Sequence, residues 1–209
     1  MRNFSRRSAI SLAATFAVMV CGSASAANRL IPLSEISSYF NAMKSASSAF
    51  TQVNEDGTLS RGNITIARPG RLRFDYAEPD GSLVLASGGQ VAIFDGAVRQ
   101  SEPQVYPLSH TPLSIFLERH VDLAAQEMVV AHTLDGPATV VRAQDPDHPD
   151  YGSIDLIFTD NPIQLRKWII TDEGGTLTTL ILADLIKQSG LSNLAFNVEA
   201  ERSKRTQQR

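Results

Sequence analysis

Apolar and polar residues alternate with two different periods along this chain, and the two periods predict different elements. From residue 31 to about residue 46, apolar side chains recur at steps of three and four, as one face of a helix requires. These apolar positions are Leu33, Ile36, Phe40 and Met43. Polar residues fill the positions between them, so the pattern predicts an amphipathic helix.

After this helix, short runs of alternating apolar and polar residues are separated by turn signals. Asp-Gly begins at residues 56, 80, 95 and 135, and other glycine-containing pairs mark further reversals. Because the connections leave no room for crossover helices, the sheet is predicted to be mostly antiparallel. The predicted strands are 48–54, 61–68, 71–77, 83–87, 91–95, 99–106, 127–134, 138–144, 153–159, 164–172, 176–184 and 194–199.

Alternation within these strands places the apolar side chains on one face. In residues 71–76 the charged residues are odd-numbered, whereas Leu72, Phe74 and Tyr76 are even-numbered. Other strands repeat the pattern with Ile64 and Ile66, with Ile154, Leu156 and Phe158, with Leu180 and Leu182, and with Leu194, Phe196 and Val198. A curved sheet would turn these faces inward and leave an apolar hollow that amphipathic helices can close.

A helical pattern interrupts the strands in residues 111–127. Thr111-Pro112 is a favourable start for a helix, and the short apolar run that follows includes Leu113 and Phe116. A second short helix is predicted over residues 121–127. The helices either pack permanently on the sheet or form a movable lid over a cavity, and patterning alone favours the packed core.

Arg68 bears on the choice between these two interpretations. On a continuous strand it lies on the same side as Ile64 and Ile66, where a guanidinium needs hydrogen-bond acceptors. Carbonyls at a helix C-terminus would supply them, so that Arg68 would hold a lid helix in place. Residue type alone favours an edge residue that bends to solvent before Pro69.

Residues 1–26 predict an export signal that is cleaved from the mature protein. Three arginines precede an uncharged run over residues 8–20, and Ala24-Ser25-Ala26 matches a signal-peptidase site. The run is too short, and too rich in alanine and serine, for a transmembrane helix. Arg6-Arg7 partly matches a twin-arginine signal, so the export route stays open.

Composition suits one exported domain. The chain has 209 residues, of which 43% are hydrophobic and 20% charged, and we assign residues 27–201 to one domain and 202–209 to a basic C-terminal tail. A net charge of −3 gives no positive surplus for a phosphate backbone, so nucleic acid is not an expected partner. Cys21 is the only cysteine, and it lies in the predicted signal after bulky residues that argue against lipid attachment.

No motif predicts catalysis or a metal site. Residues 145–150 contain three aspartates and a histidine, but two prolines among them break the spacing of a calcium loop, and a polar turn is expected. The other histidines have no ligand partners nearby in the sequence. We therefore expect no enzyme, no metal and no cofactor, and we expect Trp168 to pack in the core.

Several stretches spread over the mature chain match a known family in combination. They are Ser48–Val53 with its Phe-Thr-Gln, residues 62–67 leading into Arg68-Pro69-Gly70-Arg71 and on to Tyr76, Asp95-Gly96 with Gln100, Thr111-Pro112-Leu113, and residues 165–172 with Gly174. Together they resemble the LolA-like family, the periplasmic carriers of outer-membrane lipoproteins.

The resemblance implies a mainly β fold, an unclosed antiparallel barrel of about eleven strands whose short α-helices form a lid over an apolar cavity. In that family the arginine of the Arg-Pro pair bonds to the lid helices and stabilises the closed form, a role that carries over to Arg68. The position four residues further on is often aromatic and is Leu72 here. Candidate cavity residues are Ile64, Ile66, Leu72, Phe74, Tyr76, Leu113, Phe116, Ile154, Leu156, Phe158, Leu180 and Leu182, and the candidate lid residues are Leu33, Ile36, Phe40 and Met43.

The resemblance also implies a monomeric carrier in the periplasm. An ABC-type exporter in the inner membrane would hand over lipoproteins, the carrier would shield their acyl chains, and an acceptor on the outer membrane would receive them. Withdrawal of acyl chains from water is worth about 0.8 kcal/mol per CH₂, so such cargo needs an apolar container. The alternatives are a hydrophobic-ligand sensor of the same fold, the outer-membrane acceptor itself, or an exported enzyme with an apolar substrate pocket.

Overall fold

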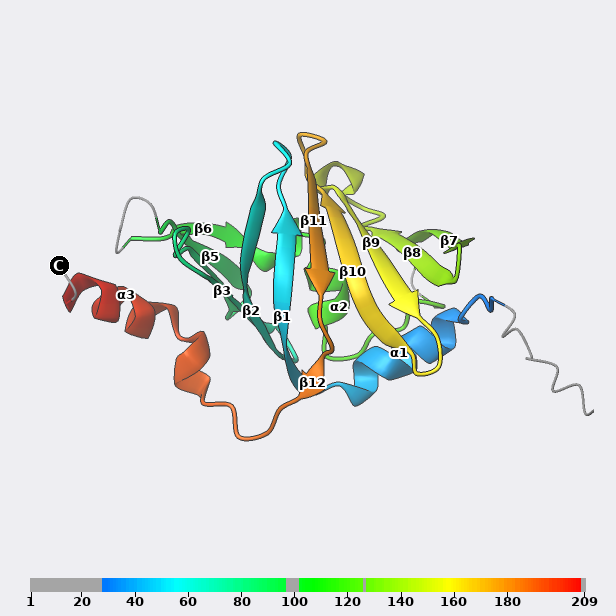
Figure 1. Cartoon of the computed structure of the whole chain (residues 1–209), viewed down its shortest axis with the longest axis horizontal. Coiled ribbons are helices and arrows are strands. Elements are labelled where there is room, and N and C mark those ends of the chain that lie inside the picture. The colour runs from blue at the N-terminus through cyan, green and yellow to red at the C-terminus, as the bar shows by residue number, and fades with distance from the viewer. Residues whose placement is uncertain (1–27, 97–101, 126, 208–209) are drawn as a thin grey trace, which may run out of the picture.

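One curved antiparallel sheet dominates the computed structural model, which describes residues 28–96, 102–125 and 127–207 (Figure 1). The strand order is β6-β5-β4-β3-β2-β1-β11-β10-β9-β8-β7, and β12 pairs with β1 beside this path. The strands are β1 Ser45–Val53, β2 Leu59–Ala67, β3 Arg71–Tyr76, β4 Leu83–Ser87, β5 Gln90–Phe94, β6 Gln104–Pro107, β7 Val129–Asp135, β8 Ala138–Gln144, β9 Ser153–Thr159, β10 Gln164–Thr171, β11 Leu177–Leu182 and β12 Ile186–Lys187.

The sheet bends into a trough that does not close. Its two ends are β6, which pairs with β5, and β7, which pairs with β8. No pairing joins β6 to β7 among the residues that the structure describes. The predicted unclosed antiparallel barrel is therefore confirmed, with β12 as a short strand that the sequence did not predict.

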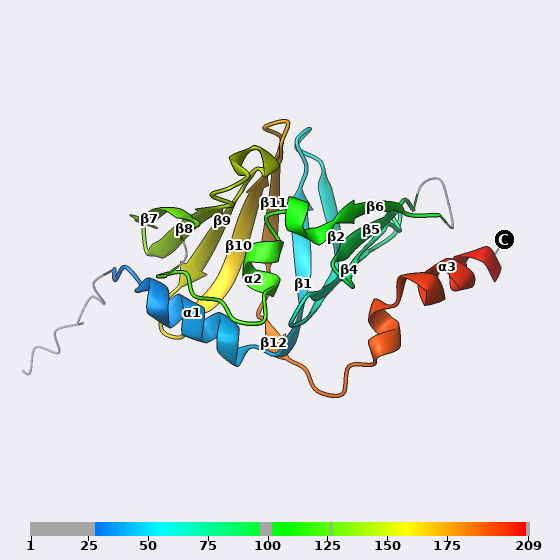
Figure 2. The ribbon, with the colours of Figure 1, turned by 180° about the vertical axis from the view of Figure 1, so that it is seen from behind.

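Two helices lie on the concave side of the sheet. Figure 2 shows α1 and α2 in front of the central strands, with α3 beyond one end of the sheet. The helices are α1 Leu33–Ala42, η1 Leu108–His110, α2 Ser114–Leu117, η2 Pro149–Tyr151, η3 Asn193–Phe196 and α3 Val198–Gln207. We call α1 and α2 together the lid helices. No helix of the described segments is long and apolar enough to cross a membrane.

The predicted alternation within the strands is confirmed where β2 meets β3. Ile64 pairs with Phe74 and Ile66 with Leu72, and all four side chains are buried in the main core. Arg71 and Arg73, between them in the sequence, lie on the other side and contact the C-terminal segment. The core therefore sits in the trough, between the sheet and the lid helices.

The predicted strand at 194–199 is wrong, because these residues form η3 and the start of α3. Side-chain caps explain the difference: the Ser192 hydroxyl accepts from the Leu194 N–H, and the side-chain amide oxygen of Asn197 accepts from the Ala200 N–H. Phe196 is buried, whereas the Leu194 side chain is 71% exposed. These residues therefore do not share one apolar face of a strand.

The C-terminal segment instead covers a second, smaller apolar cluster on the outer face of β4 and β5. This cluster contains Leu83, Leu85, Ala92 and Phe94. The guanidinium of Arg205, on α3, lies 4.9 Å from the ring centre of Phe94. Residues 202–207 of the predicted basic tail therefore belong to a helix, although α3 has no buried residue.

The predicted second short helix over residues 121–127 is absent from its described part, residues 121–125 and 127, where 123–125 and 127 form turns. Side chains of α1 bind this backbone instead: the Asn41 amide oxygen accepts from Val121 N–H, and the Ser37 hydroxyl accepts from Leu123 N–H. The first helix also ends early, at Ala42, because the following residues enter β1.

Some predictions fall outside the described residues. These are the export signal with Cys21, the first part of the predicted strand 99–106, and Gln100. The signal and the cleavage site stay predictions.

Candidate functional site

The concave face of the sheet is the candidate site, and the structure brings the predicted cavity residues together there. Eleven of the twelve are buried, and Tyr76 is partly buried against the same core cluster. The cluster also contains Ile36, Phe40 and Met43 of the predicted lid helix, with Leu33 packed against it. Strands from both halves of the chain therefore share one apolar surface with the lid helices.

Aromatic contacts join α1 to both α2 and the sheet. The Phe40 ring stacks on the Phe116 ring of α2 with 5.8 Å between centres, and it meets Phe158 of β9 edge to face at 5.8 Å. Tyr39 also meets Phe158 edge to face, at 5.8 Å. Such pairs add about 0.5–1.5 kcal/mol each beyond the burial of their area. Phe40 is therefore the central contact of α1.

A second aromatic row lines the centre of the trough. Trp168 is 1% exposed, lies 5.4 Å from the Phe116 ring and 6.2 Å from the Phe74 ring, and packs in the core as predicted. Tyr76 ends the row, and its hydroxyl donates to the Gln52 amide oxygen at 2.6 Å. Burial raises the pKa of Tyr76 to about 12, so this hydroxyl stays protonated.

The side chains of the lid helices fill the trough in this structure. Phe40 and Phe116 are both 0% exposed and occupy the space above β9 and β10. Because these side chains already cover the apolar face of the sheet, a long apolar ligand must displace them in order to bind there. The structure is therefore a closed form in which the protein's own helices occupy the candidate site.

Arg68 lies at the junction of the two lid helices. One guanidinium nitrogen donates to the Phe40 carbonyl oxygen near the C-terminal end of α1, and Nη2 donates to the Glu118 carbonyl oxygen after α2 at 2.6 Å. The backbone supports this placement, because Arg68 N–H donates to the Lys44 carbonyl and Gly70 N–H donates to the Leu117 carbonyl, both at 2.8 Å. Arg68 thus points toward the helix C-termini, as its position beside Ile64 and Ile66 suggested, and the solvent-facing edge position that residue type alone favoured is wrong.

Carbonyls at a helix C-terminus have no partner within the helix, and a cation there also complements the helix dipole. Burial lowers the pKa of Arg68, but a guanidinium stays protonated at neutral pH. Its Nε is buried without a hydrogen-bond partner. Arg68 therefore binds both lid helices through backbone carbonyl oxygens.

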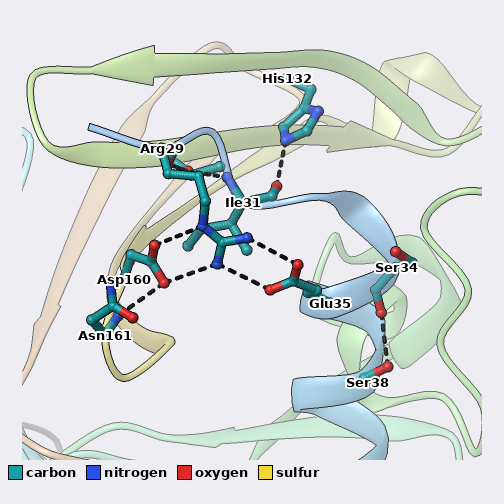
Figure 3. Close-up of polar contacts among 9 residues, drawn as sticks. Arg29, Ile31, Ser34, Glu35, Ser38, His132, Asp160 and Asn161 are labelled. Atoms are coloured by element: carbon teal, nitrogen blue, oxygen red, sulfur yellow. Dashed lines mark hydrogen bonds and ion pairs between the residues drawn. The ribbon is translucent and has the colours of Figure 1, made fainter. Parts of the chain in front are cut away.

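A second polar cluster, which the sequence does not predict, lies at the other end of α1 (Figure 3). Arg29 donates to Asp160 through Nε at 2.8 Å and through Nη2 at 3.0 Å. It also donates to Glu35 through Nη1 at 2.9 Å and through Nη2 at 3.0 Å. The guanidinium holds the pKa of both carboxyls below their usual range. Arg29 and Asp160 are 131 residues apart, so no local pattern could have predicted this cluster.

An apolar pocket opens beside the C-terminal half of α1. Its volume is about 270 Å³, and its lining comes from α1, the β9–β10 turn and the segment around β12. The lining residues are Tyr39, Ala42, Met43, Ala46, Ile163, Gln164, Leu185 and Lys187. The pocket reaches the lid helix from the rim of the trough, and it is larger than the roughly 150 Å³ cavities that bind benzene.

The acidic segment at 145–150 forms a turn, in which the Asp145 carboxylate accepts from the backbone N–H of Asp147 and of His148. The His148 ring stacks on Tyr151 at 4.6 Å. Among the described residues, no three His, Cys, Asp or Glu side chains are grouped to hold a metal ion. This segment therefore has a local role in the β8–β9 connection.

Comparison with known proteins gives a family match over most of the chain. The family model described as outer membrane lipoprotein carrier protein LolA matches residues 41–199. An outer-membrane lipoprotein carrier protein from Methylococcus capsulatus is 31% identical over 74 residues, which are 33% of this chain and 36% of that protein. The chain therefore matches about a third of that relative's length.

Solved structures with a similar fold have low sequence identity. A LolA superfamily protein from Nitrosomonas europaea is 13% identical, with a TM-score of 0.43 over 80% of this chain and 98% of that one. A protein of unknown role from Thermus thermophilus is 10% identical, with a TM-score of 0.46 over 79% and 93%. A chain from the MucA/MucB complex of Pseudomonas aeruginosa is 13% identical, with a TM-score of 0.40 over 81% and 60%.

Proposed function

Because the chain belongs to the LolA family of outer-membrane lipoprotein carrier proteins, we propose that it binds the acyl chains of lipoproteins and delivers them to an acceptor on the outer membrane. Proteins of this family are periplasmic carriers or binding proteins. The observation that carries the proposal is the apolar trough, which is covered by two short helices that one arginine joins.

When acyl chains bind in the trough, they replace the apolar side chains of the lid helices. In the closed form, side chains such as Phe40 and Phe116 cover the apolar face of the sheet. Acyl chains that replace them gain about 0.8 kcal/mol for each CH₂ withdrawn from water. The lid helices then lose their contacts with the sheet, so the net affinity is smaller than acyl burial alone would give. This balance suits a carrier, which must release its cargo.

Arg68 sets this balance in our proposal. Its bonds to the Phe40 and Glu118 carbonyls exist only while both lid helices are in place, so they favour the closed, empty form. We call this contact the Arg68 latch. An empty carrier with a stable closed form has a weaker apparent affinity for cargo, which helps transfer to the next protein.

The rest of the pathway follows from the family. An ABC-type exporter in the inner membrane would supply the lipoprotein, and the chain would act as a monomer in the periplasm after loss of residues 1–26. The protein would need no cofactor and would catalyse no reaction. Its role would be confined to binding, shielding and release.

Lipid extraction and mass spectrometry of protein purified from its native periplasm test the proposal. We expect diacylglyceryl peptides, the N-terminal fragments of lipoproteins, in the extract. Recovery of free lipids with no peptide attached would favour a hydrophobic-ligand sensor of the same fold. Recovery of a small molecule that the purified protein converts into a product would favour an enzyme, and either of these results would contradict the carrier.

A further inference from the structure

Short connections attach α1 to the sheet at both ends. Two residues separate Ala42, the last residue of α1, from Ser45 of β1, and Pro32 alone separates Leu33 from Ile31. A helix held in this way leaves the trough by turning about one connection, with the largest movement at its other end. When α1 turns about its C-terminal connection, its N-terminal end moves outward, and the side-chain contacts at that end resist the movement.

That movable end is tied to the rim of the trough by one side chain. The Arg29 guanidinium binds Glu35, in the first turn of α1, and Asp160, in the turn between β9 and β10 (Figure 3). We propose that Arg29, Glu35 and Asp160, which we call the Arg29 clamp, form a second latch that positions α1 over the acyl-binding trough. This inference rests on the proposed function only for the identity of the ligand; the geometry of the clamp does not depend on it.

The backbone around Arg29 is fixed to the sheet, so the clamp joins a fixed part to a moving part. The Ile31 N–H donates to the Thr139 hydroxyl at 2.9 Å, and a ring nitrogen of His132 lies 2.9 Å from the Ile31 carbonyl oxygen. The Asn28 amide donates to the Gly136 carbonyl at 3.0 Å. The Ile31 side chain is 0% exposed. Outward movement of the first turn of α1 must therefore separate Glu35 from Arg29 or Arg29 from Asp160.

The positive charge of the Arg29 guanidinium holds the two carboxylates of the clamp together. Nη2 lies 3.0 Å from a carboxylate oxygen of Glu35 and 3.0 Å from one of Asp160, so the two carboxylates face each other across one cation. Removal of the Arg29 charge would leave two like charges at this junction, and they would repel. Loss of Arg29 therefore removes an attraction and adds a repulsion, and both changes favour the open lid.

The exposure of the clamp suits a latch that opens easily. The side chains of Arg29 and Glu35 are 45% and 44% exposed, and solvent screens exposed pairs strongly. The clamp therefore biases the lid toward closure without locking it. The family match begins at residue 41, so Arg29, Glu35 and most of α1 lie outside the matched part of the chain, whereas Asp160 lies within it.

Hydrogen exchange of the α1 amides tests the clamp. In Arg29→Ala we expect residues 33–42 to exchange several-fold faster than in the wild type, while the central strands exchange as before. Glu35→Gln gives a second test of the same bridge, and we expect a smaller change in the same direction. Arg142→Ala is the matched control, because Arg142 makes a two-bond pair with Asp155 at similar exposure on the outer face.

Binding of a fluorescent C16 fatty acid separates this inference from the proposed function. We expect Arg29→Ala to bind the fatty acid several-fold more tightly than the wild type or Arg142→Ala. Equal α1 exchange in all three proteins would overturn the clamp, even if all of them bind the fatty acid. Faster α1 exchange in Arg29→Ala, with no fatty-acid binding by any protein, would support the clamp as a structural latch and contradict the proposed function.

Discussion

At the scale of single residues, our proposals assign control of the apolar site to two arginines. Arg68 contacts backbone carbonyls of both lid helices, whereas Arg29 contacts carboxylates of the lid and the rim. The first contact is half-buried and unaffected by side-chain protonation near neutral pH, and the second is exposed and electrostatic. Variants at the two positions should therefore differ in their response to pH.

Replacement of Arg68 tests the first latch. We expect Arg68→Ala to lower the free energy of unfolding by about 1–3 kcal/mol, because two carbonyls lose a charged donor. If about half of this loss comes from the closed form, cargo should bind roughly two- to tenfold more tightly and reach the acceptor more slowly. A reconstituted transfer assay with purified lipoprotein measures this effect. Arg68→Lys keeps the positive charge but cannot bond to two carbonyls in the same geometry, so we expect a transfer rate between those of Arg68→Ala and the wild type. Transfer at the wild-type rate in both variants would contradict the latch.

The Arg29 clamp should weaken in acid. Both carboxyls have lowered pKa values in the folded protein, so their stabilising effect is fully present above the ordinary carboxyl pKa of about 4 and is lost as the pH falls through the lowered values. The ratio of α1 exchange rates, Arg29→Ala over wild type, should therefore be greatest near neutral pH and approach one once the pH has fallen below these lowered pKa values. His132, the other titratable group that contacts this segment, is present in both proteins and should cancel in the ratio. A ratio that does not change with pH would contradict this electrostatic account.

At the scale of elements, the alternation of apolar and polar residues predicts most of the sheet. Helix-capping side chains explain the one strand that it predicts wrongly. Eleven of the twelve predicted strands correspond to observed ones, because a half-buried strand shows its buried face in every second residue. The predicted strand at 194–199 failed because Ser192 and Asn197 cap helices there. The pattern of Arg68 beside Ile64 and Ile66 placed it toward the helices, whereas the Arg29 clamp depends on a register between distant strands that no local pattern contains.

Helix α1 either packs permanently on the sheet or can leave the trough. The variant Phe40→Ala distinguishes these two possibilities. Phenylalanine to alanine changes in rigid cores cost about 3–5 kcal/mol. If α1 can leave the trough, Phe40→Ala should cost less, because the loss cannot exceed the free energy by which the closed form is favoured over the open one. Denaturant unfolding measures the total loss, and hydrogen exchange shows whether β1 and β2 stay protected. A loss in the full range, with faster exchange throughout the sheet, would indicate a permanent core.

At the scale of the whole molecule, the fold leaves one face for a removable occupant. The trough stays open between β6 and β7, and the lid helices cover it from one side. The C-terminal segment covers a separate apolar cluster on the outer face, so it does not compete with cargo for the trough. In our proposal, the sheet keeps its shape while α1 and α2 move.

The distance between α1 and the sheet, with and without cargo, is the most direct test of this account. The mature chain is predicted to contain no cysteine, so spin labels can be attached at Ser38→Cys on α1 and Ala49→Cys on β1, both of which are exposed positions. Pulsed electron paramagnetic resonance then gives the distance between the labels. We predict one narrow distance in the empty protein and a longer, broader distribution when a lipoprotein is bound. An unchanged distance at saturating lipoprotein would contradict a lid that gives way to acyl chains.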